Sequence, residues 1–121
     1  MKWDLKADRP IYAQLIEQIT TAIVSGEFPP GGKLPSVRDL AEEAAVNPNT
    51  MQKALAELER QGLVNTQRTA GRTVTEDTAM LDQVKSQLAA GQVEQFLLQM
   101  ASLGMSKEKI IELIQTKFEE A

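Results

Sequence analysis

The chain has 121 residues, of which 42% are apolar and 25% charged, and its net charge is −4. No apolar run approaches the roughly 18 residues of a membrane-spanning helix, and the N-terminus lacks the apolar stretch of a signal peptide. Histidine and cysteine are both absent, which excludes the usual zinc, copper and haem ligands and His- or Cys-based catalysis. We therefore expect a cytoplasmic, non-enzymatic protein without metal, cofactor or membrane.

The negative charge is confined to the C-terminal part of the chain. Residues 1–75 carry nine Lys/Arg and nine Asp/Glu, whereas residues 76–121 carry four lysines and eight acids. Phosphate binding depends on a local basic face rather than on total charge. The acidic composition is therefore compatible with nucleic-acid binding by the first part.

A first helix is predicted to begin near Asp8, as N-cap, with Pro10 in its first turn. Gly26 ends it, and residues 28–32 form a loop. The predicted buried stripe recurs at helical spacing and consists of Ile11, Leu15, Ile19 and Ile23, widened by Tyr12, Ile16 and Ala22.

Two shorter helices follow, each with a capping signal. Ser36 is the expected N-cap of the first, with Asp39 three residues later. Asn47 caps the second, Pro48 occupies its first position and Gly62 closes it. The predicted buried faces are Val37, Leu40, Ala41 and Ala44, then Met51, Leu55 and Leu58.

The pattern then changes to short β-prone runs at residues 63–66 and 73–75, around a turn at 67–72 that includes Ala70. This predicts a β-hairpin whose strands are too short to be stable alone, so that they must pack against the helices. Helical periodicity returns after Thr75, and Gly91 can kink that helix before Gly104 ends it. Ser106 caps the last helix, which is apolar on more than one side.

Three helices followed by a hairpin predict a mostly α fold with a small β-hairpin. We expect an N-terminal winged helix-turn-helix over residues 1–75 and a two-helix dimerisation region over residues 76–121. In such units the second helix of the pair enters the major groove and presents its N-terminal residues to base edges. Asn and Gln side chains can bond to adenine and Lys to guanine. The candidate base-reading residues are Asn47, Asn49, Thr50, Gln52 and Lys53.

Arg38, Arg68 and Arg72 would approach the same side of a winged helix. Each of these polar and basic residues could instead be an ordinary solvated surface residue. Their joint placement favours DNA binding.

The residues from Gly32 to Thr50 (GKLPSVRDLAEEAAVNPNT) and from Ala54 to Val64 closely resemble the GntR family of bacterial regulators. The segments 10–15 and 23–28 also match, so that the resemblance covers residues 8–75. The helical tail, including residues 103–111, resembles the YtrA subfamily, whose members lack a large effector domain.

The resemblance implies a role for several positions. Ser36 and Arg38 match residues that contact the DNA backbone and groove, Thr50 and Gln52 match recognition-helix contacts, and Gly71 matches the wing-tip glycine that can enter the minor groove. Two features depart from the pattern: Pro48 and Gln52 stand where some relatives carry arginine, and the wing is less glycine-rich. The base preference of relatives therefore does not transfer.

The 46 residues after position 75 are too few for a large ligand-binding domain. They could fold back on the winged helix, but a wide apolar surface favours a homodimer that reads a palindrome in double-stranded operator DNA. The candidate dimerisation residues are Phe96, Met100, Ile110, Ile111, Ile114 and Phe118. A repressor is favoured over an activator, since no surface for recruiting polymerase is evident, and a small-molecule effector is left open. The alternatives are another type of winged-helix regulator, a winged-helix adaptor that binds only protein and, least supported, a carboxylate or lysine enzyme.

Overall fold

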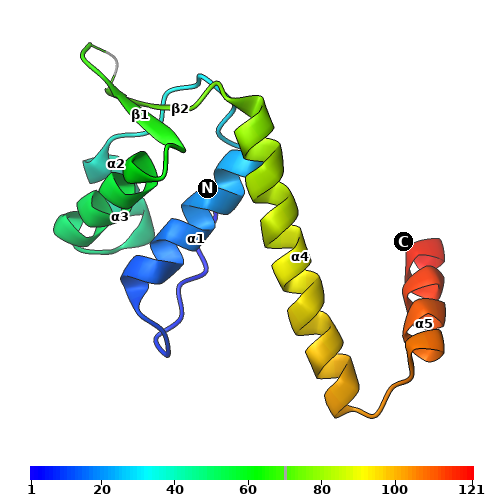
Figure 1. The fold of residues 1–121 in the computed structure, drawn as a ribbon. Coiled ribbons are helices and arrows are strands. Elements are labelled where there is room, and N and C mark those ends of the chain that lie inside the picture. The colour runs from blue at the N-terminus through cyan, green and yellow to red at the C-terminus, as the bar shows by residue number, and fades with distance from the viewer. Residues whose placement is uncertain (70) are drawn as a thin grey trace. The chain divides into compact units, whose positions relative to one another are not determined.

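The computed structural model describes residues 1–69 and 71–121, which divide into two units, Met1–Lys85 and Ser86–Ala121. Within these residues the structure is mostly helical with one antiparallel hairpin, as predicted (Figure 1). The elements in chain order are α1 (Ile11–Val24), α2 (Val37–Ala44), α3 (Pro48–Arg60), β1 (Val64–Gln67), β2 (Gly71–Val74), α4 (Thr78–Ser102) and α5 (Lys107–Glu120). None of the described helices is long and apolar enough to cross a membrane.

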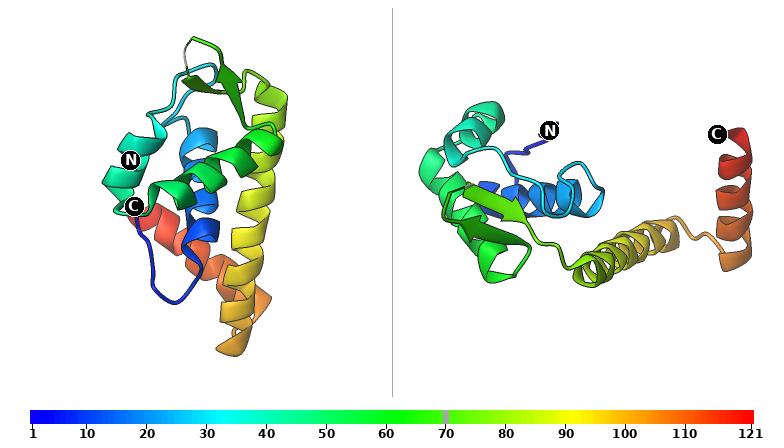
Figure 2. Two further views of the ribbon diagram at one scale, coloured as in Figure 1. Left: turned by 90° about the vertical axis from the view of Figure 1, so that its left-hand side faces the viewer. Right: turned by 90° about the horizontal axis from the view of Figure 1, so that it is seen from above.

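The core of the first unit forms where α1 and α2 pack against α3. The predicted stripes supply it, with Leu15 and Ile19 from α1, Leu40 from α2 and Leu55 from α3 all fully buried. Burial of each such side chain contributes roughly 1.5–3 kcal/mol relative to exposure. The hairpin covers one end of this core and projects beyond the three helices (Figures 1 and 2).

The start of α1 differs from the prediction. The N-cap is Pro10, in an extended conformation and without a side-chain capping bond, whereas Asp8 lies in the preceding turn. Tyr12 was expected in the buried stripe but is 39% exposed. In the first turn of a helix, small changes in helix direction decide whether a side chain at the edge of the stripe is covered, and periodicity does not contain that information.

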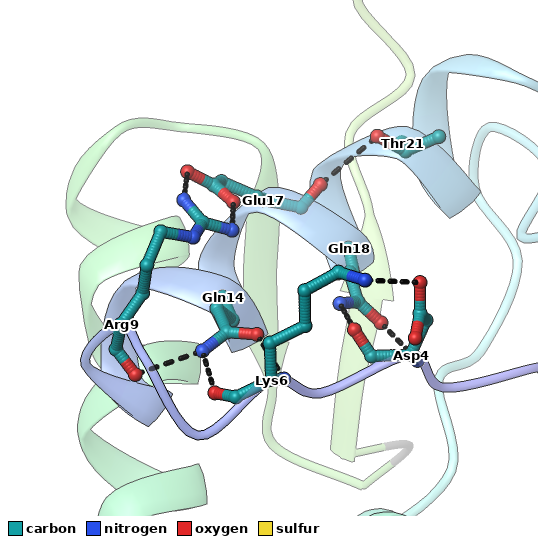
Figure 3. Close-up of polar contacts among 7 residues, drawn as sticks. All are labelled: Asp4, Lys6, Arg9, Gln14, Glu17, Gln18 and Thr21. Atoms are coloured by element: carbon teal, nitrogen blue, oxygen red, sulfur yellow. Dashed lines mark hydrogen bonds and ion pairs between the residues drawn. The ribbon is translucent and has the colours of Figure 1, made fainter.

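Two glutamines of α1 hold the N-terminal segment against the helix (Figure 3). The fully buried Gln14 accepts at Oε1 from the backbone N of Lys6 (2.7 Å) and donates from Nε2 to the carbonyl oxygens of Lys6 (2.7 Å) and Arg9 (2.9 Å). Gln18 pairs in the same way with the backbone of Asp4, at 2.9 and 2.8 Å. Each side-chain amide thus both accepts from and donates to the backbone of the N-terminal segment. These bonds satisfy the polar atoms of Gln14, which explains how this residue can be buried in the core.

The predicted caps of α2, α3 and α5 are confirmed. The side-chain oxygen of each cap accepts from a backbone N–H group in the first turn of its helix. Ser36 accepts from Asp39 (3.1 Å), Asn47 from Asn49 (2.7 Å) and Ser106 from Lys109 (3.2 Å). Between α2 and α3 the chain turns at Ala45, which has a left-handed conformation (φ 57°). Glycine usually occupies this position, since a Cβ there is strained.

The hairpin is longer than predicted. Val64 pairs with Val74 and Gln67 with Gly71, so the strands extend into the region expected to be the turn. Ala70 of that predicted turn lies outside the described residues. The chain before α2 also lies beside β2: Lys33 forms a bridge with Thr73, and the backbone N of Leu34 donates to the Arg72 carbonyl at 2.9 Å.

The second unit contains the later part of α4 and α5. The α4 helix is helical throughout, Gly91 included, because a single glycine inside a helix costs only about 1 kcal/mol relative to alanine. Gly104, with φ 74°, lies in the turn before α5.

Candidate nucleic-acid interface

The N-terminal half of α3 presents a polar face. Asn49, Gln52 and Lys53 are exposed and Thr50 is half-buried, while Met51 and Leu55 on the other side are fully buried. The buried side chains therefore fix the direction in which the polar ones point. The structure places Asn49, Thr50, Gln52 and Lys53 on this polar face and Asn47 at the exposed cap before it.

Asn47, the first of these residues, already makes a capping bond. Its Oδ1 accepts from the backbone N of Asn49 at 2.7 Å, which uses one of the two lone pairs of this oxygen. The Nδ2 donor and the second lone pair remain for another contact. Capping therefore leaves Asn47 able both to donate and to accept.

A groove of about 840 Å³ lies between the start of α2 and the hairpin. It brings together Ser36, predicted from α2, and Gly71 and Arg72, predicted from the wing, although 35 residues separate Ser36 from Gly71. Arg38 and Arg68 do not line it but are exposed on α2 and on the hairpin turn. The Nε atom of Arg72 is buried without a hydrogen-bond partner among the described residues. The groove thus offers hydroxyl and guanidinium donors suited to an anionic ligand.

Lys33 lines the same groove and was missed by the sequence analysis. Its Cε atom lies 3.9 Å from the position that a Cβ on Gly71 would occupy. The lysine therefore adds a second positive charge beside Arg72. The sequence around Lys33 does not indicate this, because the strand residues that complete the groove, Thr66, Gly71 and Arg72, come more than 30 residues later.

The second unit carries an apolar groove of about 480 Å³ between α4 and α5. Four of the predicted dimerisation residues line it, namely Phe96, Met100, Ile114 and Phe118. The other lining residues are Leu113, Lys117 and Ala121. Ile111 lies outside the groove and is 45% exposed. Ile110 differs from the other five, because it is only 8% exposed in the single chain and has little surface left for a partner.

A model of the bacterial regulatory proteins of the gntR family matches residues 11–74, from the start of α1 to the end of β2. The chain belongs to the GntR family. The matched range contains the polar face of α3 and the groove between α2 and the hairpin, and the chain is a transcriptional regulator of this family.

Other GntR proteins resemble the chain beyond the family range. The repressor YtrA of Bacillus subtilis (strain 168) is 37% identical over 113 residues, which cover 93% of this chain and 87% of YtrA. The structure of a GntR-family regulator from Listeria monocytogenes is 40% identical with a TM-score of 0.84, over 93% of this chain and 98% of that one. Both matches include the two-helix tail, which confirms the predicted resemblance to YtrA.

A further similar structure includes DNA. The DNA-binding domain of AraR, solved in complex with its operator ORE1, is 30% identical with a TM-score of 0.53, over 62% of this chain and 94% of that one. The similarity to AraR is thus confined to about the length of the first unit.

Proposed function

We propose that this GntR regulator is a cytoplasmic homodimeric repressor that recognises a palindromic operator in double-stranded DNA and has no catalytic activity. The observation that carries the proposal is the exposed polar face of α3, whose direction is fixed by buried residues of the same helix. The operator complex of the similar AraR domain supports DNA as the ligand.

Three parts of the first unit would contact different parts of the duplex. The first half of α3 would enter the major groove, where Asn49, Gln52 and Lys53 can bond to base edges. Ser36, Arg38 and the groove with Lys33 and Arg72 would contact phosphates, which position the protein without reading sequence. Gly71, on the hairpin, is assigned to the minor groove by resemblance to the family, and the exposed Arg68 on the hairpin turn would add positive charge beside it.

The second unit supports dimerisation. Its apolar groove is lined by side chains from α4 and α5 that remain partly exposed, among them Ile114 at 36% and Phe118 at 78%, and exposed apolar patches of this kind mark association sites. A two-fold dimer would present two copies of α3 and so would favour a palindrome. The name of the similar YtrA supports repression as the outcome.

Selection of the purified full chain against a random duplex library, with affinity followed across salt concentrations, tests this function. We expect an enriched palindrome and a steep fall of affinity with salt, because each neutralised phosphate releases counterions. A folded protein that enriches no sequence and shows no salt-dependent binding would instead be a winged-helix adaptor for other proteins.

A further inference from the structure

A second groove, of about 640 Å³, lies between α1 and α3. Its α3 side is formed by Thr50, Lys53, Glu57 and Arg60, whose spacing of three and four residues places them on one face of the helix, with Ala56 beside them. Tyr12 from the first turn of α1 forms the other side. None of these residues lines the groove between α2 and the hairpin.

Tyr12 is the one residue of this groove that does not come from α3. Its side chain is 39% exposed, and its hydroxyl makes no hydrogen bond to another described residue. A phenol on a helix surface that is neither buried in the core nor bonded to the protein is free to donate to a ligand.

The single acid of the groove is already neutralised. Arg60 binds the Glu57 carboxylate with two hydrogen bonds, one of them from Nε at 2.8 Å, and Gln61 donates to it at 2.9 Å. These bonds lower the pKa of Glu57 to about 2. Lys53 forms no ion pair among the described residues, so the groove has one uncompensated positive charge.

We propose that this groove holds a backbone phosphate of the same duplex that α3 reads, with the Tyr12 hydroxyl donating to a phosphate oxygen and Lys53 supplying charge. The inference rests on the proposed function. Thr50 and Lys53 belong both to the base-reading half of α3 and to the groove, so DNA seated on α3 reaches the groove directly. A helix in the major groove has a sugar–phosphate strand on either side, which accounts for a phosphate contact apart from that of α2 and the hairpin.

Tyr12→Phe removes only the hydroxyl oxygen and tests the proposal in the full chain. A lost hydrogen bond to a charged acceptor should cost roughly tenfold in affinity at each half-site, so the dimer should bind every duplex roughly a hundredfold more weakly. Because a phenol is neutral, the slope of log affinity against log salt should stay unchanged, and so should the selected sequence. Thr21→Val is a matched control, since Thr21 carries an exposed hydroxyl on α1 but does not line the groove; it should bind like the wild type.

Two further measurements locate the contact. Single methylphosphonate substitutions along the selected duplex should weaken the wild type at several phosphates, and Tyr12→Phe should be insensitive to one of them in each half-site. Tyr12 is the only tyrosine in the chain, so 3-fluorotyrosine labelling gives one ¹⁹F resonance, which should shift when the duplex is added. An unchanged melting temperature would show that the variant is folded.

Wild-type affinity in Tyr12→Phe, with no ¹⁹F shift on adding DNA, would overturn the inference while leaving the proposed function intact. A loss confined to particular bases would also overturn it, because Tyr12 would then read sequence. A wild type that binds no duplex would refute the proposed function itself.

Discussion

Arg38 and Gln52 are both exposed side chains near the start of a helix, and the proposed function gives them different kinds of contact. Arg38 is the second residue of α2, two positions after the Ser36 cap, and its guanidinium would pair with phosphate. Gln52 lies in the first half of α3, whose polar face is directed by the buried Met51 and Leu55. A charge that positions the protein and an amide that reads a base have different experimental signatures.

Arg38→Ala should weaken binding to all duplexes alike and reduce the salt slope by about two, because the dimer loses one phosphate contact in each half-site. Gln52→Ala should cost roughly 1–3 kcal/mol at particular base pairs and leave the slope unchanged. Binding titrations on the selected site, on its single-base variants and on unrelated duplexes separate the two. An equal loss on every sequence from Gln52→Ala would remove this residue from base reading.

Gln14→Ala should lower the free energy of unfolding by about 1–3 kcal/mol. The substitution removes three part-buried hydrogen bonds between the buried Gln14 amide and the backbone of Lys6 and Arg9. Urea-induced unfolding measures the change. Gln18→Ala, which loses the equivalent bonds at a more exposed position, should cost less; equal costs would show that burial is not the cause.

At the scale of elements, α3 has one face that is buried in the core and one that is polar and exposed. Near its C-terminal end this helix carries an ion pair between Glu57 and Arg60. Its cap and its apolar spacing are local signals, which is why its start and buried face could be predicted from sequence. The partners of its exposed face could not, because Tyr12 comes from α1, some 40 residues earlier.

The ion pair between Glu57 and Arg60 makes stability depend on pH in a defined direction. Hydrogen bonds from Arg60 and Gln61 lower the pKa of Glu57 from 4.5 to about 2. A lowered pKa means that the stabilisation is complete above about pH 4.5 and is lost as the pH falls toward 2. The difference in unfolding free energy between wild type and Glu57→Gln should therefore shrink over that range.

Arg60→Gln provides the control for this measurement. In that background Glu57→Gln should no longer change the pH dependence of unfolding, since the principal partner is gone. A pH-dependent difference of the same size in both backgrounds would contradict the assignment.

At the scale of the whole molecule, the two units have different kinds of surface. The first buries its large apolar side chains around α3, whereas the second leaves several of them exposed on α4 and α5. Such a surface is stabilised by association rather than by a core of its own. The prediction of a dimer rests on this exposed surface as a whole and not on any single contact within the chain.

Replacing Ile111 and Ile114 by lysine should yield monomers, because two charges would have to be buried in an apolar interface. Analytical ultracentrifugation measures the state, and binding to the selected palindrome should weaken with it. Gln115→Lys with Thr116→Lys is the control, since it adds the same charge to α5 at exposed polar positions. A double isoleucine variant that still sediments as a dimer would refute the interface.

The sequence alone determined the order of the elements, the caps at Ser36, Asn47 and Ser106 and most of the buried face of each helix in the first unit. These features depend on residues within a few positions of one another, where capping bonds and helical periodicity operate. The motifs from Gly32 to Val64 also sufficed for the GntR family.

The tertiary structure decided what depends on segments far apart in the chain. Lys33 joins the proposed DNA interface because its segment pairs with β2. Pro10 rather than Asp8 is the N-cap of α1, beside a segment that Gln14 binds. Ile110 is covered while its neighbour Ile111 is exposed. Each outcome depends on which element packs on which face, and the pattern along a single helix or strand carries no information about its neighbour.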